Sequence, residues 1–339
     1  MDYYNDLADR ALEGHALTQE QSLSVLSAPD DELLLVLHAA YRVRRRCFGD
    51  DVHMQILSNA KSGLCPEDCH YCSQSSASTA EIERYPLLAE DELLEQARYA
   101  ARVGARRFCM ALSGRTLTDA ELADLCRIMR TLKEQTGLEL CGSLGFLDEG
   151  QAEALRAAGL DRVNHNLNTS ERFYSEICTT HTYADRVATI RRCRAAGLEL
   201  CCGGIVGEGE THEDIVDLLM ALREIRPESI PINFLVPVKG TPFEGRGGEL
   251  TPRFCLKVLC LARFLNPDRE IRAAGGREVN LRSLQPLALF AVNSLFVNGY
   301  LTTGGQPVEE ARGMIADMGF DLLVEGDVPQ RAGRGGHDA

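Results

Sequence analysis

A recurring junction constrains the fold of this chain more than any other feature of its sequence. A segment with the apolar spacing of a helix ends in glycine, and a short β-rich segment follows at once, at Gly104, Gly137, Gly159 and Gly197. Glycine is the usual residue just past the C-terminus of a helix. A chain that alternates helix and strand in this way builds a parallel sheet covered by helices.

Eight segments fit strands of this sheet, four of them after the junction glycines. They are residues 52–57, 106–111, 138–141, 161–166, 198–201, 229–236, 270–274 and 294–297. Eight parallel strands close a (β/α)8 barrel of the TIM type, so the predicted fold class is α/β. We expect residues 1–50 to form an N-terminal helical extension and residues 51–325 to form the barrel. Residues 326–339, which hold almost no apolar side chain, are predicted to be a short disordered C-terminal tail.

The charge of the chain argues against nucleic acid as a partner. With 36 basic and 50 acidic residues, the formal net charge is −14, whereas binding to a phosphate backbone draws on basic surface. The first six residues are acidic and polar, unlike a signal peptide, and the longest apolar run, 33–41, is too short to span a bilayer. We therefore expect a cytoplasmic protein with no membrane contact and a small-molecule substrate.

Three of the 13 cysteines fall within eight residues, at Cys65, Cys69 and Cys72. The spacing is too tight for a disulfide framework, and three ligands are one short of a closed zinc site. An iron–sulfur cubane normally takes one thiolate per iron, so three cysteines leave one iron free to bind another ligand. An open cluster is the favoured interpretation, with a partial zinc knuckle or unligated loop cysteines as the alternative.

The spacing Cys-x3-Cys-x2-Cys, with Tyr71 directly before the third cysteine, resembles the radical S-adenosylmethionine (SAM) enzymes. The wider string from Ser62 to Ser75 resembles the biotin synthase family within them. The resemblance implies that the three loop cysteines are catalytic and hold a [4Fe-4S] cluster whose open iron binds SAM. It also implies the activity, in which a 5′-deoxyadenosyl radical takes hydrogen from dethiobiotin and a second iron–sulfur cluster gives the sulfur that closes the ring of biotin.

Three further cysteines share one position in their strands. Cys109, Cys141 and Cys201 each follow a junction glycine by four or five residues, so they lie at about the same depth and converge if they face inward. Arg272 falls mid-strand in the same layer, where a guanidinium is costly unless it meets an anion or a ligand. Inert buried thiols and an outward arginine are the alternatives. The resemblance implies that these four residues hold the second cluster, [2Fe-2S], and that Arg272 is also catalytic.

An alternating row of asparagines, Asn164, Asn166 and Asn168, is predicted to lie on one face of a single strand. Three amides in this position would lack partners unless a polar ligand met them. The segment from Asn164 to Thr169 resembles the family pattern Asn-His-Asn-Leu-(Asp/Asn)-Thr. The resemblance implies that Asn164 and Asn166 contact the ureido ring of dethiobiotin, and that Asn166 and Asn168 contact the ribose of SAM.

The resemblance implies four further binding residues. Asn233 matches a family residue on the substrate ring. Ile205 and Gly207, in the glycine-rich segment 203–210, match the apolar and backbone contacts of the family to SAM, and Tyr71 is counted with them. Without the resemblance, this segment would be interpreted as an ordinary loop between a strand and a helix.

One position departs from the family pattern, because Cys202 stands where serine is usual. Neighbouring residues on a strand point to opposite faces, so Cys202 is expected to be an outward, packed thiol. If the strand bulges there, Cys202 would alter the type of the second cluster. The remaining cysteines are interpreted as structural; they are Cys47, Cys126, Cys178, Cys193, Cys255 and Cys260.

The favoured function is that of a sulfurtransferase, a radical SAM enzyme of the biotin synthase type. The resemblance further implies a flavodoxin- or ferredoxin-type electron donor and a homodimer. Two alternatives stand beside it. One is another radical SAM enzyme on the same barrel, which inserts sulfur elsewhere or matures a metal cofactor, and the other is an iron–sulfur carrier that makes no radical.

Overall fold

The computed structural model describes residues 2–246, 248 and 250–323, so the predicted disordered tail, 326–339, lies outside the described residues. The strands are β1 Asp51–Lys61, β2 Arg107–Leu112, β3 Glu139–Ser143, β4 Arg162–Asn164, β5 Glu199–Cys201, β6 Gly204–Val206, β7 Ser229–Phe234, β8 Glu270–Ala273, β9 Ser294–Val297 and β10 Asp321–Leu322. The α-helices are α1 Asp2–Leu12, α2 Gln19–Leu26, α3 Leu33–Phe48, α4 Glu90–Arg102, α5 Asp119–Thr136, α6 Glu149–Ala157, α7 Tyr174–Ile177, α8 Tyr183–Ala195, α9 His212–Ile225, α10 Pro252–Leu265, α11 Arg277–Leu281 and α12 Val308–Asp317. There are also two 3-10 helices in the described part, η1 Asp30–Glu32 and η2 Arg282–Phe290.

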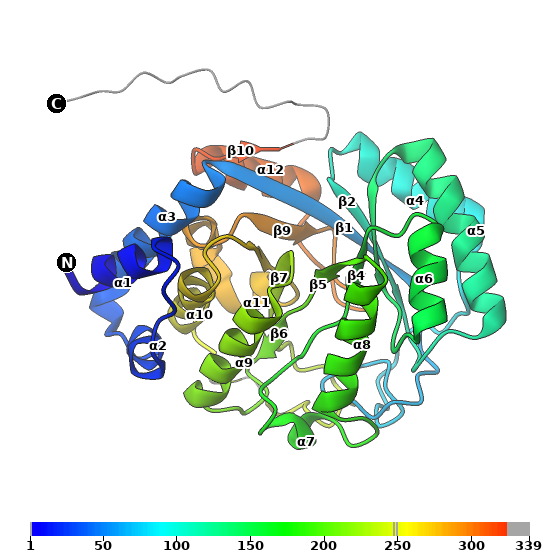
Figure 1. The fold of residues 1–339 in the computed structure, drawn as a ribbon, viewed down its shortest axis with the longest axis horizontal. Coiled ribbons are helices and arrows are strands. Elements are labelled where there is room, and N and C mark those ends of the chain that lie inside the picture. Colours follow the sequence, from blue (N-terminus) through cyan, green and yellow to red (C-terminus); the bar gives the residue numbers. More distant parts are fainter. Residues whose placement is uncertain (1, 247, 249, 324–339) are drawn as a thin grey trace.

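Eight parallel strands form a closed barrel, which confirms the predicted fold class. Hydrogen bonds join them in the order β1-β2-β3-β4-β5-β7-β8-β9, and β9 returns to β1 through the pair His53 and Ser294. Each of the eight predicted segments overlaps one of these strands. The sequence does not predict two short strands, β6, which pairs with β7, and β10, which pairs with the start of β1. Figure 1 shows the helices arranged around the outside of the barrel.

Strand β4 is shorter than predicted and ends at Asn164, so the three asparagines do not lie on a single strand. Beyond it, the chain stays beside its neighbour through hydrogen bonds from His165 N to Cys201 O (2.9 Å) and from Asn168 N to Gly203 O (3.1 Å). Asn168 adopts a left-handed conformation, with φ 73°, which lies outside the β region of a strand. The prediction of one alternating row is therefore wrong.

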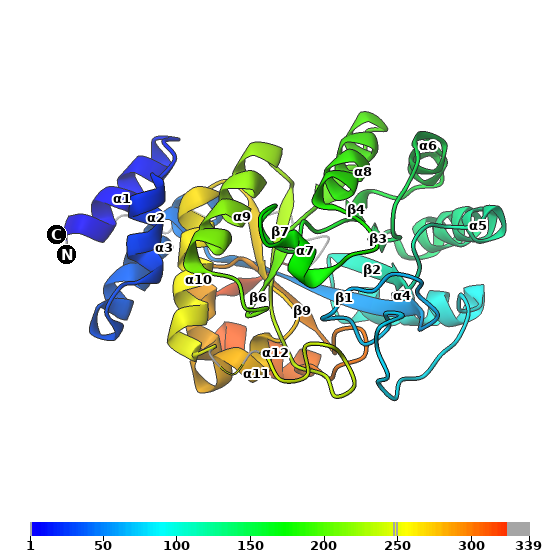
Figure 2. The ribbon, with the colours of Figure 1, turned by 90° about the horizontal axis from the view of Figure 1, so that it is seen from below.

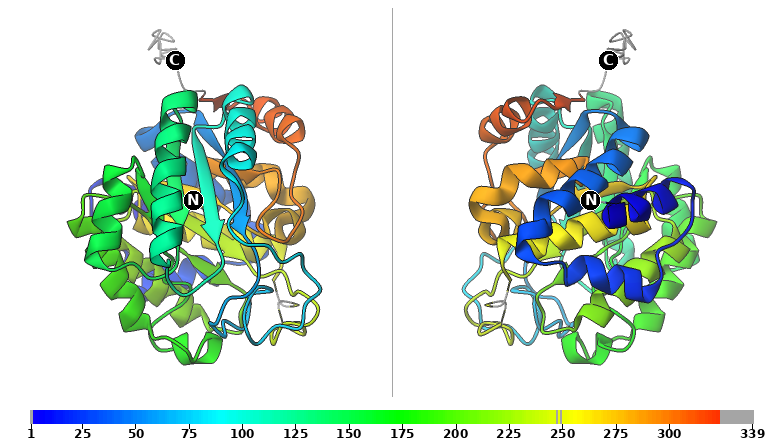
Figure 3. Two further views of the ribbon diagram at one scale, coloured as in Figure 1. Left: turned by 90° about the vertical axis from the view of Figure 1, so that its right-hand side faces the viewer. Right: turned by 90° about the vertical axis from the view of Figure 1, so that its left-hand side faces the viewer.

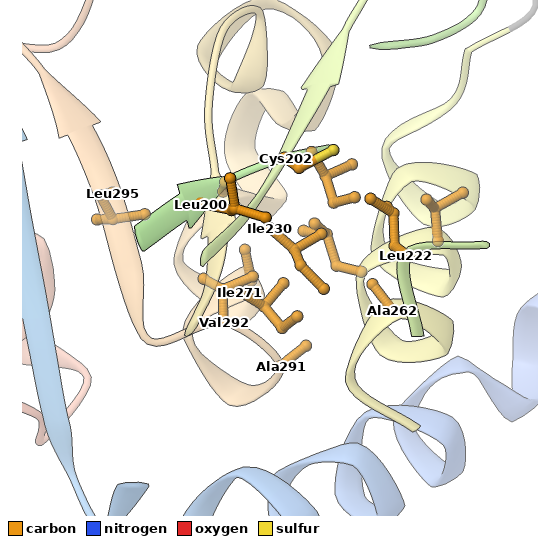
Figure 4. Close-up of a cluster of buried hydrophobic side chains, with 14 of the residues drawn as sticks. Leu200, Cys202, Leu222, Ile230, Ala262, Ile271, Ala291, Val292 and Leu295 are labelled. Atoms are coloured by element: carbon orange, nitrogen blue, oxygen red, sulfur yellow. The ribbon is translucent and has the colours of Figure 1, made fainter. Parts of the chain in front are cut away.

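The main apolar core lies between the outer face of the barrel and the helices packed on it. Figure 4 shows Leu200 and Ile230, from neighbouring strands, in a cluster with Leu222 of α9 and Ala262 of α10. Every side chain from Cys255 to Leu265 of α10 is buried, because α2 and α3 also pack against this helix. In Figures 1 and 2 the N-terminal helices α1–α3 form an extra layer on this side of the barrel.

Two long connections leave the C-terminal end of the barrel, and one of them carries the predicted cluster loop. Segment 62–89 follows β1 and segment 235–251 follows β7; Figure 3 shows both below the strands, in blue to cyan and in yellow. Thr79 N donates to Gly240 O at 2.8 Å, so the two segments touch. Active sites of (β/α)8 barrels are built at this end. Across the described residues, no helix has the length and apolarity needed to cross a bilayer.

Candidate active site

A cavity of about 280 Å³ opens at this end of the barrel, between the cysteine loop and the ends of the strands. The predicted site residues that line it are Cys65, Cys69, Tyr71, Cys72, Asn164, Asn166, Asn168, Ile205 and Asn233. Gly207 is not among the described residues that line it. Its φ is 101° and its N–H donates to Glu210 Oε1 at 2.7 Å, so Gly207 shapes the turn after β6. With that exception, the structure brings the predicted loop, SAM and substrate residues to one cavity.

Backbone N–H groups point at the sulfur atoms of the cysteine loop. The donors are Glu67 and Gly114 toward Cys65 Sγ, and Gln74 and Ser75 toward Cys72 Sγ. Hydrogen bonds to sulfur are among the features by which proteins tune iron–sulfur clusters. Burial raises the pKa of Cys72 to about 11, so this thiol stays protonated until a metal displaces the proton. The loop therefore fits a cluster held by thiolates.

Deeper in the barrel, Cys109, Cys141 and Cys201 meet in one cluster with Ala274 and Phe296, so the predicted convergence of these cysteines is found. Cys109 and Cys141 are directly paired across β2 and β3. A smaller cavity of about 30 Å³ is lined by Cys109 and Cys141 and shares part of its wall with the larger one. The shared residues are Ala111, Ser143, Asn164, Tyr300 and Leu301. The strand cysteines therefore lie next to the larger cavity, on its inner side.

Arg272 is completely buried beside these cysteines and faces inward. Its Nη1 donates to Cys201 Sγ (3.4 Å), its Nη2 to Ser229 Oγ (2.8 Å) and its Nε to Ser294 Oγ (3.1 Å). Asn164 Nδ2 also donates to Cys201 Sγ, at 3.2 Å. Two donors on one sulfur favour its thiolate form, which is the form that ligates metals. Its contact with Cys141 and its burial nevertheless raise the pKa of Cys201 well above its usual value, so this thiol keeps its proton until a metal displaces it. This donor set fits an iron–sulfur cluster.

A buried carboxylate balances the charge of this arginine. Glu270 accepts from Arg272 and from Ser229 Oγ, and its second oxygen lies 3.7 Å from Arg107 Nη1 and 3.6 Å from Arg162 Nη1. Burial alone would raise the pKa of Glu270, but the three arginines hold it well below its usual range. Glu270 is therefore ionised, and it anchors the layer of side chains beneath the strand cysteines.

The asparagines have protein partners, so the expectation of amides without partners is wrong. Asn166 Oδ1 accepts from Gly203 N (3.0 Å), and Asn168 Nδ2 donates to the Tyr71 hydroxyl (2.7 Å). Both amide atoms of Asn233 bond to backbone groups, at 3.0 and 2.9 Å. These bonds hold the side chains in place. Because an amide offers two donors and two acceptor sites, each asparagine can also meet a ligand.

Cys202 packs outside the barrel, as predicted for the residue next to Cys201. Figure 4 shows it in the apolar cluster that contains Leu222 and Ile230. Its N–H donates to Ser229 O at 2.9 Å, which keeps the chain in contact with β7 at this point. Cys202 therefore does not join the cluster of thiols inside the barrel.

Comparison with known proteins identifies the family. Residues 61–222 match the model of the radical SAM superfamily, and residues 231–321 match that of the Biotin and Thiamin Synthesis associated domain. The biotin synthase of Rhodopirellula baltica is 49% identical over 320 residues, which cover 94% of this chain and 89% of that protein. The biotin synthase of Bacillus subtilis is 47% identical over 322 residues, which cover 95% and 96%. The chain belongs to the biotin synthase family.

The activity and cofactors are those of the family. The protein is a sulfurtransferase that converts dethiobiotin to biotin by radical SAM chemistry, with SAM, a [4Fe-4S] cluster and a [2Fe-2S] cluster. Solved structures support the fold alone. Methylornithine synthase has a TM-score of 0.81 at 21% identity, covering 94% of this chain and 97% of its own. The FeFe-hydrogenase maturase of Carboxydothermus hydrogenoformans has a TM-score of 0.79 at 15% identity, covering 94% and 78%.

Sequence reasoning missed several residues that line the larger cavity, among them Glu67, His181 and Arg186. Glu67 lies in the cysteine loop and bonds to His181, and His181 contacts Arg186 at 3.0 Å. Arg186 lies on α8 among other arginines, so the sequence holds no signal that distinguishes it. Glu67 lies inside the cysteine motif, between Cys65 and Cys69, and that position is the signal by which the sequence could have pointed to it.

His181 also belongs to a buried group of potential metal ligands. The Sγ atoms of Cys69 and Cys178 and a ring nitrogen of His181 lie within 4.8 Å of one another. Both nitrogens of His181 already have partners, Glu67 on one side and Arg186 on the other. Cys69 is in addition one of the predicted cluster ligands. We therefore interpret the group as a hydrogen-bonded cluster behind the loop rather than as a separate metal site.

Proposed function

We propose that the two cavities form one reaction chamber, with the cysteine loop at one end and the strand cysteines at the other. The observation that most supports this is the shared wall, in which Ala111, Asn164 and Tyr300 line both cavities. Sulfur insertion requires a radical source and a sulfur donor on either side of one substrate, in a space that excludes water. A single chamber with thiols at both ends meets these requirements.

SAM binds at the end formed by the cysteine loop. Cys65, Cys69 and Cys72 hold the [4Fe-4S] cluster, and Tyr71, Asn166, Asn168, Ile205 and Gly207 form the surroundings of SAM, with Gly207 shaping the turn behind it. Arg186 adds a positive charge to this part of the wall. SAM carries one carboxylate, and a guanidinium matches a carboxylate in both charge and geometry. Arg186 is therefore the partner that we propose for it.

Dethiobiotin binds between the two ends. Cys109, Cys141, Cys201 and Arg272 hold the [2Fe-2S] cluster, and Asn164, Asn166 and Asn233 hold the ureido ring of the substrate. When bound, SAM and the clusters supply a 5′-deoxyadenosyl radical for hydrogen abstraction and the sulfur that is inserted. The rings of Phe296 and Tyr300 pack with centroids 5.5 Å apart beside the strand cysteines, and they exclude water from them.

Two alanine variants of anaerobically reconstituted protein test this division of roles. Cys65→Ala should form neither 5′-deoxyadenosine nor biotin, because its loop lacks a cluster ligand. Cys109→Ala should retain some SAM cleavage and form no biotin. Cys193→Ala removes a buried thiol of α8 that packs in the main apolar core, apart from both cysteine sets, and should retain both activities.

The assay contains dithionite, SAM and dethiobiotin, and both products are quantified by mass spectrometry. Iron content is measured on each variant before the assay. An equal loss of both products in Cys65→Ala and Cys109→Ala would contradict the division of roles. A wild-type protein that releases 5′-deoxyadenosine but no biotin would contradict the proposed substrate.

A flavodoxin- or ferredoxin-type protein is proposed as the electron donor. The outer edge of the cysteine loop supports this, because Leu64 is 74% exposed and the next residue, Cys65, is partly exposed. A protein donor can therefore approach the loop closely. Each reduced donor is tested in place of dithionite, with 5′-deoxyadenosine as the product measured. Absence of product with both donors would overturn this part of the proposal.

A cytoplasmic homodimer is also proposed. The homodimer rests on the resemblance to the family, whereas the compartment is supported by the 13 cysteines, all of which are free, as expected in a reducing environment. Light scattering coupled to size-exclusion chromatography measures the mass of the particle. A mass equal to that of one chain would exclude the homodimer.

A further inference from the structure

Glu67 links the cysteine loop to the wall of the cavity. It lies between the first two cysteines of the loop and is 5% exposed. Its Oε1 accepts from Arg115 Nη1 (2.8 Å), and its Oε2 accepts from Thr180 Oγ1 (2.6 Å) and from His181 Nδ1. An ionised carboxylate only accepts hydrogen bonds. The hydrogen on the His181 side of this contact must therefore belong to Nδ1.

The second nitrogen of His181 fixes the state of its ring. Nε2 lies 3.0 Å from Arg186 Nη2, and because arginine only donates, Nε2 must accept. A neutral imidazole with its hydrogen on Nδ1 satisfies both contacts. His181 is 4% exposed, and its ring packs edge-on against the ring of Phe146, with centroids 4.9 Å apart. Packing and hydrogen bonds thus hold the imidazole in one orientation.

Arg186 is the third member of this chain of contacts. Its Nε donates to the Tyr174 hydroxyl, and its Nη1 donates to Asn166 O at 3.2 Å. Together with the bond from Nη2 to His181, these contacts use one N–H on each of the three nitrogens. A guanidinium has five N–H groups, so one unused N–H remains on Nη1 and one on Nη2. The Arg186 side chain that carries them lines the cavity. Two such groups can bind both oxygens of one carboxylate.

We propose that Glu67 and His181 are positioning residues that aim Arg186 at the carboxylate of SAM. The proposal rests on the function proposed above, in which Arg186 meets that carboxylate. Glu67 fixes the ring of His181, and His181 takes one N–H of Arg186, so the guanidinium keeps a single orientation. Because Glu67 belongs to the cysteine loop, the same contacts set the distance between the cluster and the guanidinium. The amino-acid part of SAM has to reach both.

Three variants separate this role from general support of the loop. His181→Phe keeps an aromatic ring against Phe146 but offers no acceptor to Arg186 and no donor to Glu67. His181→Gln restores both, since its amide has an oxygen for Arg186 and an N–H for Glu67. Thr180→Val is the matched control, because it removes another bond to the same oxygen of Glu67 and leaves His181 and Arg186 in contact.

Binding is measured by anaerobic equilibrium dialysis of the iron-loaded proteins with SAM and with decarboxylated SAM, which lacks only the carboxylate. We expect His181→Phe to bind SAM about tenfold more weakly than the wild type, because a charge-assisted contact loses its alignment. The same variant should bind decarboxylated SAM as the wild type does. His181→Gln and Thr180→Val should bind both compounds with wild-type affinity.

Three results for His181→Phe would overturn the proposal: unchanged affinity for SAM, equal weakening toward both compounds, or loss of iron. The last two would mean that the ring supports the pocket or the loop as a whole. If His181→Phe does not fold, His181→Leu is measured with the same expectations. Failure of the proposed function would give a different result in the wild type. The wild type would then bind SAM and decarboxylated SAM equally, or it would release no 5′-deoxyadenosine.

Discussion

At the scale of single residues, Cys201 and Cys202 illustrate how a strand separates two chemistries. Cys201 accepts hydrogen bonds from Arg272 and Asn164 inside the barrel, whereas Cys202 packs among apolar side chains outside it. Successive side chains of a strand point to opposite faces. The environment of each thiol follows from that alternation, although the two are adjacent in the sequence.

Cys201→Ala and Cys202→Ala are therefore expected to differ. Cys202→Ala should keep the iron content and visible spectrum of the wild type and lose about 1 kcal/mol of unfolding free energy, because it removes one buried atom from a packed core. Cys201→Ala should lose the absorbance of the second cluster only. Iron analysis and absorption spectroscopy measure both effects, and loss of that cluster from Cys202→Ala would refute the outward placement.

Glu270→Gln should be among the most damaging single changes in the barrel. Removing this charge leaves Arg272, Arg107 and Arg162 without their shared carboxylate, and an unpaired buried charge costs about 3–5 kcal/mol. Glu199→Gln is the control, since Glu199 is half exposed and, among the residues that the structure describes, forms its ion pair with Arg162 alone. This change should cost under about 1 kcal/mol. Urea unfolding compares the two, and equal losses would contradict this role of Glu270.

Part of the candidate site could be located by a local rule, whereas Asn233 and Ile205 came only from the resemblance to the family. Cys109, Cys141 and Cys201 could be found because each lies at a similar distance from the start of its strand, and strands alternate their faces. Arg186 could not be found, since its approach to the cavity depends on how α8 packs against the barrel. The bonding of Asn166 to Gly203 likewise depends on a neighbouring strand.

At the scale of elements, α9 shows how a helix start also organises the site. Its N-cap Thr211 accepts from Asp214 N, and Asp214 Oδ2 accepts in return from Thr211 N at 2.9 Å. Asp214 is 3% exposed and also accepts from Ser170 Oγ (2.6 Å) and Arg172 Nη2 (2.8 Å). The segment that carries the asparagines is thereby tied to the start of α9.

Asp214→Asn should lower the unfolding free energy by about 2 kcal/mol at pH 7, because it removes the charge from several buried hydrogen bonds. Burial alone would raise the pKa of Asp214, but these hydrogen bonds lower it from 3.8 to about 2. A lowered pKa adds stability above the pKa of the unfolded chain, so the difference between variant and wild type should shrink only as the pH falls from about 4 toward about 2.

The exposed neighbour Glu213 provides the control for this prediction. Glu213→Gln should change the unfolding free energy by less than about 0.5 kcal/mol. Urea unfolding of the wild type and the two variants at pH 7 measures the effect. Equal stability of Asp214→Asn and Glu213→Gln would show that the buried carboxylate of Asp214 contributes no more than an exposed one.

The positions of strands could be predicted better than their ends. The junction glycines locate β2, β3, β4 and β5 because a helix stop is a local signal. The end of β4 could not be located, since it depends on hydrogen bonds from residues 165–168 to the chain around β5 and β6. Strands β6 and β10 have three and two residues, too few for an alternating pattern to be recognised.

At the scale of the whole molecule, the N-terminal helices complete the burial of α10. This helix packs against α2 and α3 as well as against α9, α11 and η2. Its side chains from Cys255 to Leu265 are buried as a result, including Lys257, whose ammonium bonds to Ala28 O and to Asp30 Oδ1 (2.9 Å). A barrel helix with apolar side chains on so much of its surface requires cover on more than one side.

Deletion of residues 1–28, which removes α1 and α2 but leaves α3, should therefore uncover part of α10. We expect a lower yield of soluble protein, self-association and a lower thermal unfolding temperature, because a large apolar surface becomes exposed. The cysteines of both sets stay in place in this variant. Light scattering and thermal unfolding measure the outcome, and a monodisperse product with wild-type thermal stability would contradict this role of the N-terminal helices.

The ion pairs of Glu270 with Arg107 and Arg162 fill the barrel on the far side of the strand cysteines. On its other side, the small cavity beside Cys109 and Cys141 shares Tyr300 and Leu301 with the larger cavity, in which we propose that SAM and dethiobiotin bind. If sulfur for the second cluster is replaced through the larger cavity, it can enter only after SAM and dethiobiotin, or their products, have left. Repair of the second cluster and catalytic turnover could then not take place at the same time.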